Sequence, residues 1–256
     1  MDKVTDSKML EALVSIVRDA GKEVMSIYKT NFTVDAKDDS SPVTVADRRT
    51  ESLILNALAD LAPDIPAVSE EAATCGAVYD LRSRFWLVDP LDGTKEFINR
   101  NGEFTVNIAL IEHSLPTLGV VFAPAIDRLF AGSSNGAFCE AAHARAAARC
   151  RVAPSTGVTV VTSRSHTNER ALSQFLAKRH VAKVLNAGSS LKLCLVANGE
   201  ADLYPRLGTT MEWDTAAGHA VLRAAGGEVR DLSSRPLIYG KPAFVNPHFV
   251  AHGESA

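Results

Sequence analysis

The first half of the chain contains two stretches in which apolar side chains recur every three to four residues. Over residues 6–29, and again over about 44–61, this spacing places them on one face of a helix. An unbroken apolar run at residues 85–88 is instead typical of a short buried strand. We expect that strand to stop at Asp89, because Pro90 cannot donate a hydrogen bond to a sheet ladder.

Further along, short apolar runs alternate with Gly, Pro, Asn and Ser turns. Four of them predict an antiparallel meander of strands, at residues 104–111, 118–122, 128–131 and 137–140. Beyond residue 150, strand patterns at 158–162, 181–185, 201–204 and 228–231 alternate with helix patterns at 168–178, 190–197 and 215–225. Alternation of this kind indicates an α/β layer. We therefore expect an α+β subdomain over residues 1–150 and an α/β subdomain over residues 151–256.

The composition is that of an ordinary globular protein, since 46% of the 256 residues are hydrophobic and 22% are charged. A net charge of -3 gives no reason to expect a nucleic-acid polymer as partner. The polar start of the chain has no apolar signal core, and no run approaches the ~18 apolar residues of a membrane span. Four dispersed cysteines without a CxxC pair indicate reduced thiols in the cytoplasm. Association with a membrane surface stays open.

The main candidate for chemistry follows the predicted buried strand. Asp89 and Asp92 lie three residues apart, with the carbonyl of Leu91 between them. Thr94 adds a hydroxyl just after the turn that Gly93 permits. Hard oxygen ligands gathered in this way suit Mg²⁺. The alternative is a Pro-Asp-Gly turn, in which Asp92 only helps the chain to reverse.

Three more carboxylates lie on or beside apolar segments. Asp47 is seven residues before Ile54, on the apolar face of its predicted helix, where an unpaired carboxylate is costly. Glu70 follows an apolar run, as Asp89 does, and Asp214 precedes a predicted helix with small residues that permit close approach to another element. A structural alternative exists for each. Asp47 could lie in the first turn of a helix, where the helix dipole favours a carboxylate. Glu70 could lie on the solvated surface, and Asp214 could be an N-cap.

The second half adds polar loops next to predicted strands and helices. Ser163 and His166 follow a predicted strand directly. The segment from Gly188 to Lys192 opens a predicted helix, whose free N–H groups and dipole favour an anion beside the lysine. The alternatives are an ordinary Gly-Ser helix cap and a surface histidine.

Together these motifs resemble the inositol monophosphatase-like family of Mg²⁺-dependent, lithium-sensitive phosphatases. The matching pieces, in the family's order, are SPVTVAD at 41–47, Glu70-Glu71, DPLDGT at 89–94 and WDTAAG at 213–218. Four further motifs are similar to the 3′(2′),5′-bisphosphate nucleotidases of this family: SRSH at 163–166, GSSLK at 188–192, ADLYPR at 201–206 and MEWDTAAGHA at 211–220. The resemblance implies a fold of the α/β (α+β) class. It would be the layered α-β-α-β-α sandwich of the inositol monophosphatase and fructose-1,6-bisphosphatase type.

The resemblance also implies a set of metal ligands. Glu70, Asp89 and the Leu91 carbonyl would hold one Mg²⁺ ion. Asp89, Asp92 and Asp214 would hold a second. Glu70 would also help to hold a third, weaker ion that carries the attacking water.

The remaining positions that match the family imply catalysis and substrate binding. Asp47 and Thr94 would orient and deprotonate the attacking water. The nucleotide would be contacted by Ser163, His166, Gly188 and Lys192. The connection between Glu70 and Asp89 is short, so the sequence does not show whether a lid covers the site.

The implied reaction is hydrolysis of adenosine 3′,5′-bisphosphate to AMP and phosphate, a step of sulfur metabolism, by direct attack of water. Two metal ions can neutralise the phosphoryl oxygens and lower the pKa of a water. The sulfated analogue, 3′-phosphoadenosine 5′-phosphosulfate, stays open as a second substrate. Two other functions also stay open: hydrolysis of inositol monophosphate or another sugar phosphate, and a non-catalytic Mg²⁺-dependent regulatory role. The partner is thus a small molecule, and the sequence shows no interface for the homodimer that is common in such families.

Overall fold

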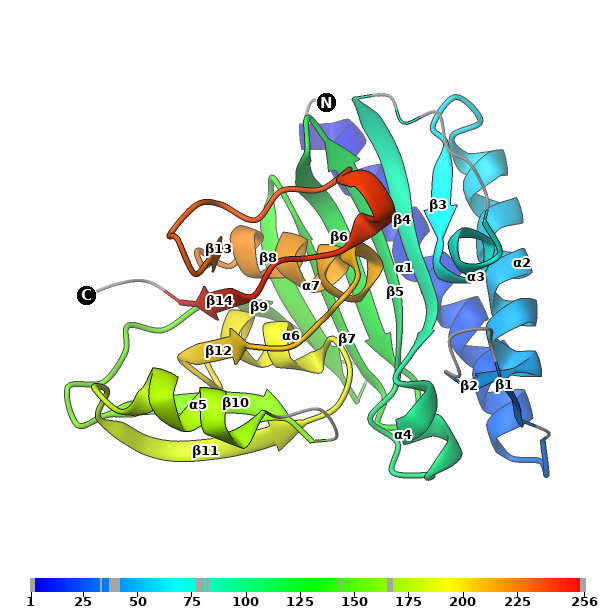
Figure 1. Cartoon of the computed structure of the whole chain (residues 1–256). Helices are drawn as coiled ribbons and strands as arrows, with labels where there is room; N and C mark the ends of the chain where they lie inside the picture. The colour runs from blue at the N-terminus through cyan, green and yellow to red at the C-terminus, as the bar shows by residue number, and fades with distance from the viewer. Residues whose placement is uncertain are drawn as a thin grey trace.

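The computed structural model describes residues 3–32, 34–36, 42–76, 81, 83–142, 144–164 and 168–253. Over these residues the chain forms a seven-stranded sheet, a five-stranded sheet and a small two-stranded sheet. Helices lie on both faces of the larger sheet and on the outer side of the smaller one (Figure 1). The predicted layered α-β-α-β-α sandwich is therefore confirmed.

The seven-stranded sheet is built from consecutive strands in the order β3-β4-β5-β6-β7-β8-β9. Its strands are β3 (Ala67–Ser69), β4 (Arg84–Asp92), β5 (Thr105–Glu112), β6 (Leu115–Ala123), β7 (Arg128–Ser133), β8 (Gly136–Ala141) and β9 (Ala144–Ala148). Only β3 and β4 pair in parallel. All later neighbours are antiparallel, which confirms the predicted meander. Strand β9 was not predicted, because its alanines carry no alternating pattern.

Strand β4 does not stop at Asp89, as we predicted, but continues to Asp92. Asp89 pairs with Asn107 of β5, and Asp92 pairs with Thr105. Three steps along β4 thus face two steps along β5, which is the pattern of a β-bulge. The bulge lets the ladder pass Pro90 and turns the strand end towards the site described below.

Two long helices cover one face of the seven-stranded sheet. They are α1 (Lys3–Tyr28) and α2 (Val45–Leu61), close to the two helices predicted from apolar spacing. Their buried side chains pack with those of one face of β4, β5 and β6 in a single hydrophobic core. The helices are held there by this apolar stripe, because burial of each large aliphatic side chain contributes about 1.5–3 kcal/mol.

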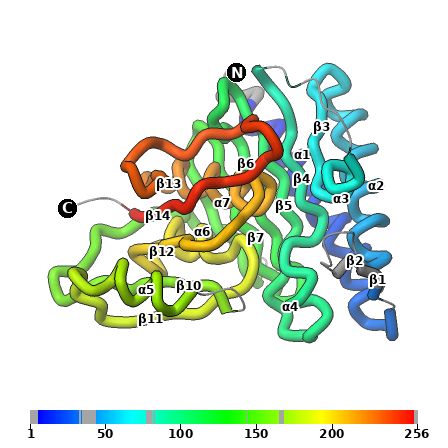
Figure 2. The backbone as a smooth tube through the Cα atoms, viewed as in Figure 1, coloured from blue at the N-terminus to red at the C-terminus, as the bar shows by residue number. Residues whose placement is uncertain are grey.

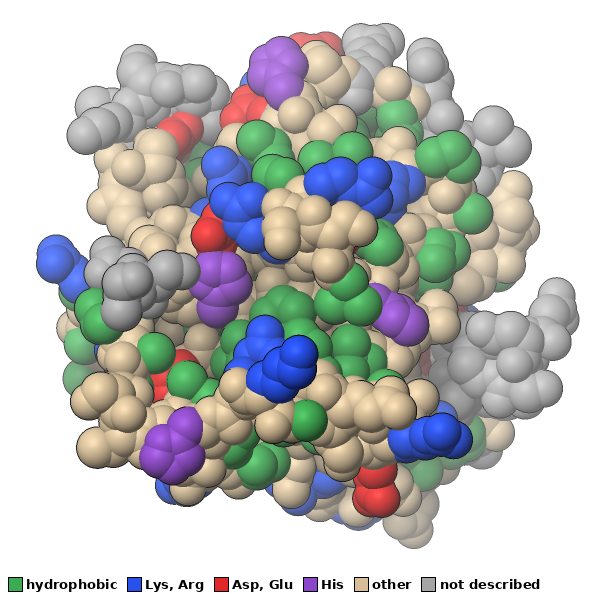
Figure 3. Space-filling model, turned by 60° about the vertical axis from the view of Figure 1, so that its left-hand side comes forward, with side chains coloured by type: hydrophobic (Ala, Val, Ile, Leu, Met, Phe, Trp, Pro, Cys, Tyr) green, Lys and Arg blue, Asp and Glu red, His purple; other side chains and the backbone are tan. Residues whose placement is uncertain are grey.

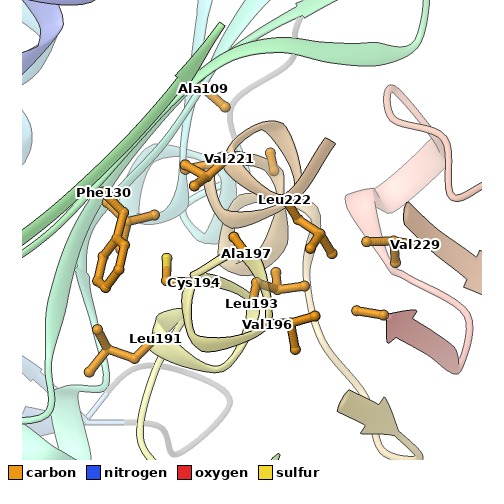
Figure 4. Close-up of a cluster of buried hydrophobic side chains, with 14 of the residues drawn as sticks. Ala109, Phe130, Leu191, Leu193, Cys194, Val196, Ala197, Val221, Leu222 and Val229 are labelled. Atoms are coloured by element: carbon orange, nitrogen blue, oxygen red, sulfur yellow. The ribbon is translucent and has the colours of Figure 1, made fainter. Parts of the chain in front are cut away.

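The opposite face of the sheet is covered by α6 (Leu191–Ala197) and α7 (Glu212–Ala224). A second hydrophobic core fills the space between these helices and the two sheets. Figure 4 shows its centre, where Phe130 of β7 faces Cys194 of α6, and Leu222 of α7 faces Val229. Because this core takes side chains from before and after residue 150, the division into two subdomains stays a prediction.

The five-stranded sheet has the order β11-β10-β12-β14-β13. Its strands are β10 (Val158–Ser163), β11 (Val181–Ala187), β12 (Leu203–Arg206), β13 (Glu228–Asp231) and β14 (Phe249–His252). The first three pair in parallel, and β14 joins them by antiparallel pairing. Helix α5 (Glu169–Leu176) lies on its outer side (Figure 1). The predicted α/β alternation is confirmed, whereas β14 was not predicted.

The remaining elements are short. They are β1 (Val34–Ala36), β2 (Pro42–Thr44), α3 (Glu70–Thr74), α4 (Thr94–Ile98) and the 3₁₀ helix η1 (Pro242–Phe244). The backbone trace shows α3 beside the far end of β3, and α4 directly after β4 (Figure 2). No helix among the described residues is both long and apolar enough to cross a lipid bilayer.

Candidate active site

Several chain segments meet where strand β4 ends. A cleft of about 820 Å³ opens here, between the start of α4, the loop before α6, the end of β12 and the start of α7. Six of the predicted site residues line it: Glu70, Asp92, Thr94, Ser163, Lys192 and Asp214. Residues as far apart in the sequence as Glu70 and Asp214 are thus brought to one cleft.

Three carboxylates that line this cleft, those of Glu70, Asp92 and Asp214, lie near the carboxylate of Asp89, and we call these four the carboxylate wall. Asp89 is almost fully buried, with 1% of its surface exposed. Burial raises its pKa well above the usual range, and the negative charges of Glu70, Asp92 and Asp214 raise it further. The pKa of Asp214 rises to about 8, first by burial and then by the charges of Asp92 and Glu70. A cluster of this kind is unfavourable unless protons or a cation balance the charge.

The donor set fits a hard divalent cation. It combines carboxylates with the carbonyl of Leu91, and oxygen ligands of these kinds are those that Mg²⁺ selects. Within the described part of the chain, however, no three Asp, Glu, His or Cys side chains are already arranged to hold a metal ion. A hydrogen bond between Glu70 and Asp89 helps to raise the pKa of Asp89. A shared proton thus balances part of the repulsion that a cation would otherwise balance.

The predicted pair Asp47 and Thr94 is brought together by α2 and α4. The Thr94 hydroxyl donates to Asp47 Oδ1 at 3.4 Å and lies 3.3 Å from the Leu91 carbonyl oxygen. The other oxygen, Oδ2, accepts hydrogen bonds from the backbone N–H and the hydroxyl of Thr44, both at 2.7 Å. Asp47 therefore closes the capping box of α2 and contacts Thr94 at the same time. The two interpretations of Asp47 do not exclude one another.

Asp214 also lies in the first turn of its helix, but it is not the N-cap, so that interpretation is wrong. The N-cap of α7 is Met211, and its backbone N–H donates to Asp214 Oδ2 at 2.9 Å. The helix begins three residues earlier than we predicted because Glu212 and Trp213 join its first turn. Glu212 is completely buried and accepts from the backbone N–H groups of Gly240 and Lys241, which anchors this end of α7.

The loop between β11 and α6 lies against the carboxylate wall. Ser189 donates from its hydroxyl to Asp92 Oδ2 at 2.7 Å. Lys192 is 5% exposed, and its ammonium donates to the carbonyl oxygen of Ser189. Burial lowers the pKa of Lys192 to about 8, although the charge of Asp92 opposes this shift. Lys192 therefore lies within electrostatic reach of the predicted metal ligands.

The free N–H groups expected at the start of α6 are partly used within the protein. The backbone N–H of Gly188 donates to Glu103 Oε2 at 2.8 Å. Ser190 is the N-cap, but its hydroxyl donates to Asn107 Oδ1 at 2.8 Å and caps no helix N–H. The alternative of a Gly-Ser helix cap is thus right about the N-cap position of Ser190, but the serine side chain does not cap the helix. Ser163 lies at the end of β10 and lines the cleft, whereas His166 is outside the described residues.

The structure adds site residues that the sequence analysis missed. Tyr204 and Arg206 line the cleft from β12. Arg206 donates from Nη2 to the carbonyl oxygen of Thr209 at 2.7 Å, while its buried Nε has no hydrogen-bond partner in the described structure. Ser189 was passed over although it lies within the GSSLK motif. A signal for Arg206 was present, because it is the basic residue that ends the ADLYPR motif at 201–206.

The fold and this cleft have known counterparts. The sequence matches the model of the inositol monophosphatase family over residues 5–255, and the chain belongs to this family. It is 46% identical to the 3′(2′),5′-bisphosphate nucleotidase CysQ of Shigella flexneri, over 94% of this chain and 98% of that protein. The corresponding protein of Escherichia coli strain K12 matches equally well.

Solved structures agree with this assignment. The CysQ protein of Bacteroides thetaiotaomicron, described as a bacterial member of the inositol monophosphatase family, has a TM-score of 0.81 at 37% identity. The match covers 96% of this chain and 97% of that one. An IMPase of Thermotoga maritima has a TM-score of 0.77 at 24% identity, covering 96% and 92%, and shows the shared fold.

Proposed function

We propose that this protein is a Mg²⁺-dependent phosphatase that converts adenosine 3′,5′-bisphosphate to AMP and phosphate. One observation carries the proposal: a single cleft is lined by crowded carboxylates and by the cations Lys192 and Arg206. The carboxylates suit metal ions on a reacting phosphate. The two cations suit a second anionic group of the same substrate. The names of the relatives that are 46% identical support this choice of substrate.

The metal ions would be held by Glu70, Asp89, the Leu91 carbonyl, Asp92 and Asp214. When bound, such ions neutralise phosphoryl oxygens and lower the pKa of a coordinated water. Asp47 and Thr94 would orient the attacking water, with the Thr94 hydroxyl as its contact and Asp47 Oδ1 as the final proton acceptor. Because Asp47 Oδ2 is occupied by Thr44, the other oxygen stays turned towards Thr94.

The rest of the substrate would be held by other residues that line the cleft. Arg206 contributes a guanidinium, and Tyr204 and Ser163 add a ring and a hydroxyl. His166 stays a proposed nucleotide contact. On the face drawn in Figure 3, the described Lys and Arg side chains are spread among polar and apolar ones, as expected for a protein with a small-molecule partner.

The alternative function is hydrolysis of inositol monophosphate or another sugar phosphate. We expect phosphate release from adenosine 3′,5′-bisphosphate to exceed release from AMP and inositol monophosphate at equal substrate concentration, because only the bisphosphate has a second phosphate for the cations Lys192 and Arg206. Activity should vanish in EDTA and return with Mg²⁺, and Asp89→Asn should lose nearly all of it. Preference for inositol monophosphate, or full activity in EDTA, would refute the proposal.

Arg206 gives a sharper test of the substrate. Arg206→Met keeps most of the apolar stem but removes the guanidinium. We expect the KM for the bisphosphate to rise by roughly 10- to 100-fold, the effect of losing one charge-assisted hydrogen bond of about 1.5–3 kcal/mol. The kcat should change less, since Arg206 is not among the proposed metal ligands. Equal losses on a small monophosphate would assign Arg206 to the metal site or the fold.

A further inference from the structure

Beside the cleft, the two larger sheets are joined by a charged side chain that belongs to neither the metal set nor the catalytic pair. Glu103 lies between α4 and β5, on the side of the seven-stranded sheet. Its carboxylate accepts from Arg164 Nε at 2.8 Å and from Arg164 Nη2 at 2.7 Å. Arg164 directly follows β10 of the other sheet. This bidentate pair is of the strong, geometrically defined kind, and it lowers the pKa of Glu103.

The same carboxylate also holds the loop before α6. Glu103 Oε2 accepts from the backbone N–H of Gly188 at 2.8 Å. A Cβ at position 188 would come within 2.8 Å of the Glu103 carbonyl oxygen and 3.0 Å of Glu96 Cγ. Glycine is therefore required for this close approach, because real Cβ atoms do not come within 3.0 Å of backbone. Arg164 adds a third contact to this loop, because its Nη2 donates to the carbonyl oxygen of Asn186 at 3.2 Å.

The next residue of that loop carries the contact to the carboxylate wall. Ser189 has a positive φ of 52°, which is uncommon for a residue other than glycine. In this conformation its hydroxyl reaches Asp92 Oδ2 at 2.7 Å. A strained backbone persists only where surrounding contacts determine it. The contacts of Glu103 and Arg164 just before Ser189 contribute to that determination, together with the contacts that Lys192 and Thr105 make with Ser189 itself.

We propose that Glu103 is a positioning residue, which fixes the loop at Gly188 so that Ser189 orients Asp92 for metal binding. The inference rests on the proposed function for the role of Asp92. Glu103 also connects the metal ligands to Ser163, which lines the cleft, because its partner Arg164 directly follows Ser163 at the end of β10. Glu103 itself touches neither substrate nor metal and acts only through Ser189.

The test measures Mg²⁺ binding in addition to activity. We expect Glu103→Ala to raise the Mg²⁺ concentration that gives half of the Mg²⁺-induced increase in Tm by about tenfold, as for loss of one hydrogen bond to a charged group. Glu103→Gln keeps an acceptor for Gly188 but not the charge, so its effect should be smaller. Ser189→Gly should match Glu103→Ala in Mg²⁺ response and avoid the strain of a positive φ. The double variant should be no worse than either single one, because both changes act along the same path.

A matched control is available on the other side of the molecule. Glu11 of α1 likewise forms a bidentate ion pair with Arg145 of β9, in which the arginine is about as exposed as Arg164 but the glutamate is more exposed than Glu103. Glu11→Gln should leave the Mg²⁺ response unchanged. A normal Mg²⁺ response in Glu103→Ala and Glu103→Gln, with only a fall in Tm, would overturn the inference. So would additive effects of the Glu103 and Ser189 changes. Failure of the wild type to hydrolyse the bisphosphate would refute the proposed function instead, and would leave the Mg²⁺ response as a separate result.

Discussion

Two of the acidic residues in the cleft serve the backbone and the site at once. Asp47 and Asp214 each accept a hydrogen bond from the backbone N–H three residues earlier, in the first turns of α2 and α7. A carboxylate in this place is favoured by the helix dipole. The same contact limits how the carboxylate can rotate, so its remaining oxygen has a defined direction. Helix starts thereby supply oriented acids without further side chains.

This double role predicts different phenotypes for the two members of the catalytic pair. Asp47→Asn should lower kcat strongly and also reduce stability by about 0.5–2 kcal/mol, because the capping box of α2 is weakened. Thr94→Val should lower kcat to a similar extent but leave the capping box of α2 intact. Measurement of kcat and of urea unfolding for both variants separates the effects. Unchanged kcat in Thr94→Val would remove it from the catalytic pair.

At the scale of elements, α7 holds the metal wall in place because it packs unusually close to the sheet. A Cβ added at Gly119 of β6 would lie 2.5 Å from the carbonyl oxygen of Ala217, and one at Gly132 of β7 would lie 2.7 Å from Val221 Cα. The small residues of TAAG make this approach possible, as the sequence suggested. The close packing of α7 against the sheet in turn determines where Asp214 lies relative to the sheet.

Gly119→Ala should therefore destabilise the protein by about 1–3 kcal/mol, the usual cost of overpacking a core. It should also weaken the effect of Mg²⁺ on Tm, because α7 must move away from the sheet and take Asp214 with it. Gly208→Ala is the control for stability, since a Cβ there meets nothing within 4 Å. An equal, small change of Tm in both variants would show that the sheet adapts to the added methyl group.

For the whole molecule, stability at low pH should depend on a buried histidine far from any proposed ligand role. His219 of α7 is 3% exposed and its Nδ1 lies 2.9 Å from the Tyr239 hydroxyl. Burial lowers the pKa of His219 from 6.5 to about 3. Below pH 6.5 the unfolded chain therefore binds a proton that the folded protein does not bind, so stability falls by about 1.4 kcal/mol per pH unit until about pH 3.

The carboxylates of the cleft act with the opposite sign. The raised pKa values of Asp89 and Asp214 stabilise the metal-free protein at low pH, and this contribution is lost as pH rises. A comparison with His219→Asn isolates the histidine, since both proteins share the carboxylates. Between pH 7 and pH 5, in EDTA, the wild type should lose about 2 kcal/mol more unfolding free energy than the variant. Equal losses by urea unfolding would show that His219 takes up its proton in the folded state.

The sequence by itself determined the elements and the acidic residues of the site. Apolar spacing located α1, α2 and the meander β5 to β8, because each pattern is local and repeats with the period of its element. The motifs around Asp89 and Asp214 placed the carboxylates beside buried segments for the same reason. Two of the predicted bounds were wrong: a β-bulge carries β4 past Pro90, and α7 begins before Asp214.

Only the tertiary structure decided how the loop before α6 is joined to Asp92 and Glu103. Ser189 and Asp92 are 97 residues apart, and Glu103 and Gly188 are 85 residues apart. No local pattern encodes such a pair, because a polar side chain in a loop has the same local surroundings whether its partner is water or a distant carboxylate. From the sequence, the N–H of Gly188 was expected to be free for a ligand. In the folded protein it donates to Glu103 instead. Burial then shifted the pKa values of Asp89, Asp214 and Lys192, since desolvation depends on what covers a group and not on its neighbours in the chain.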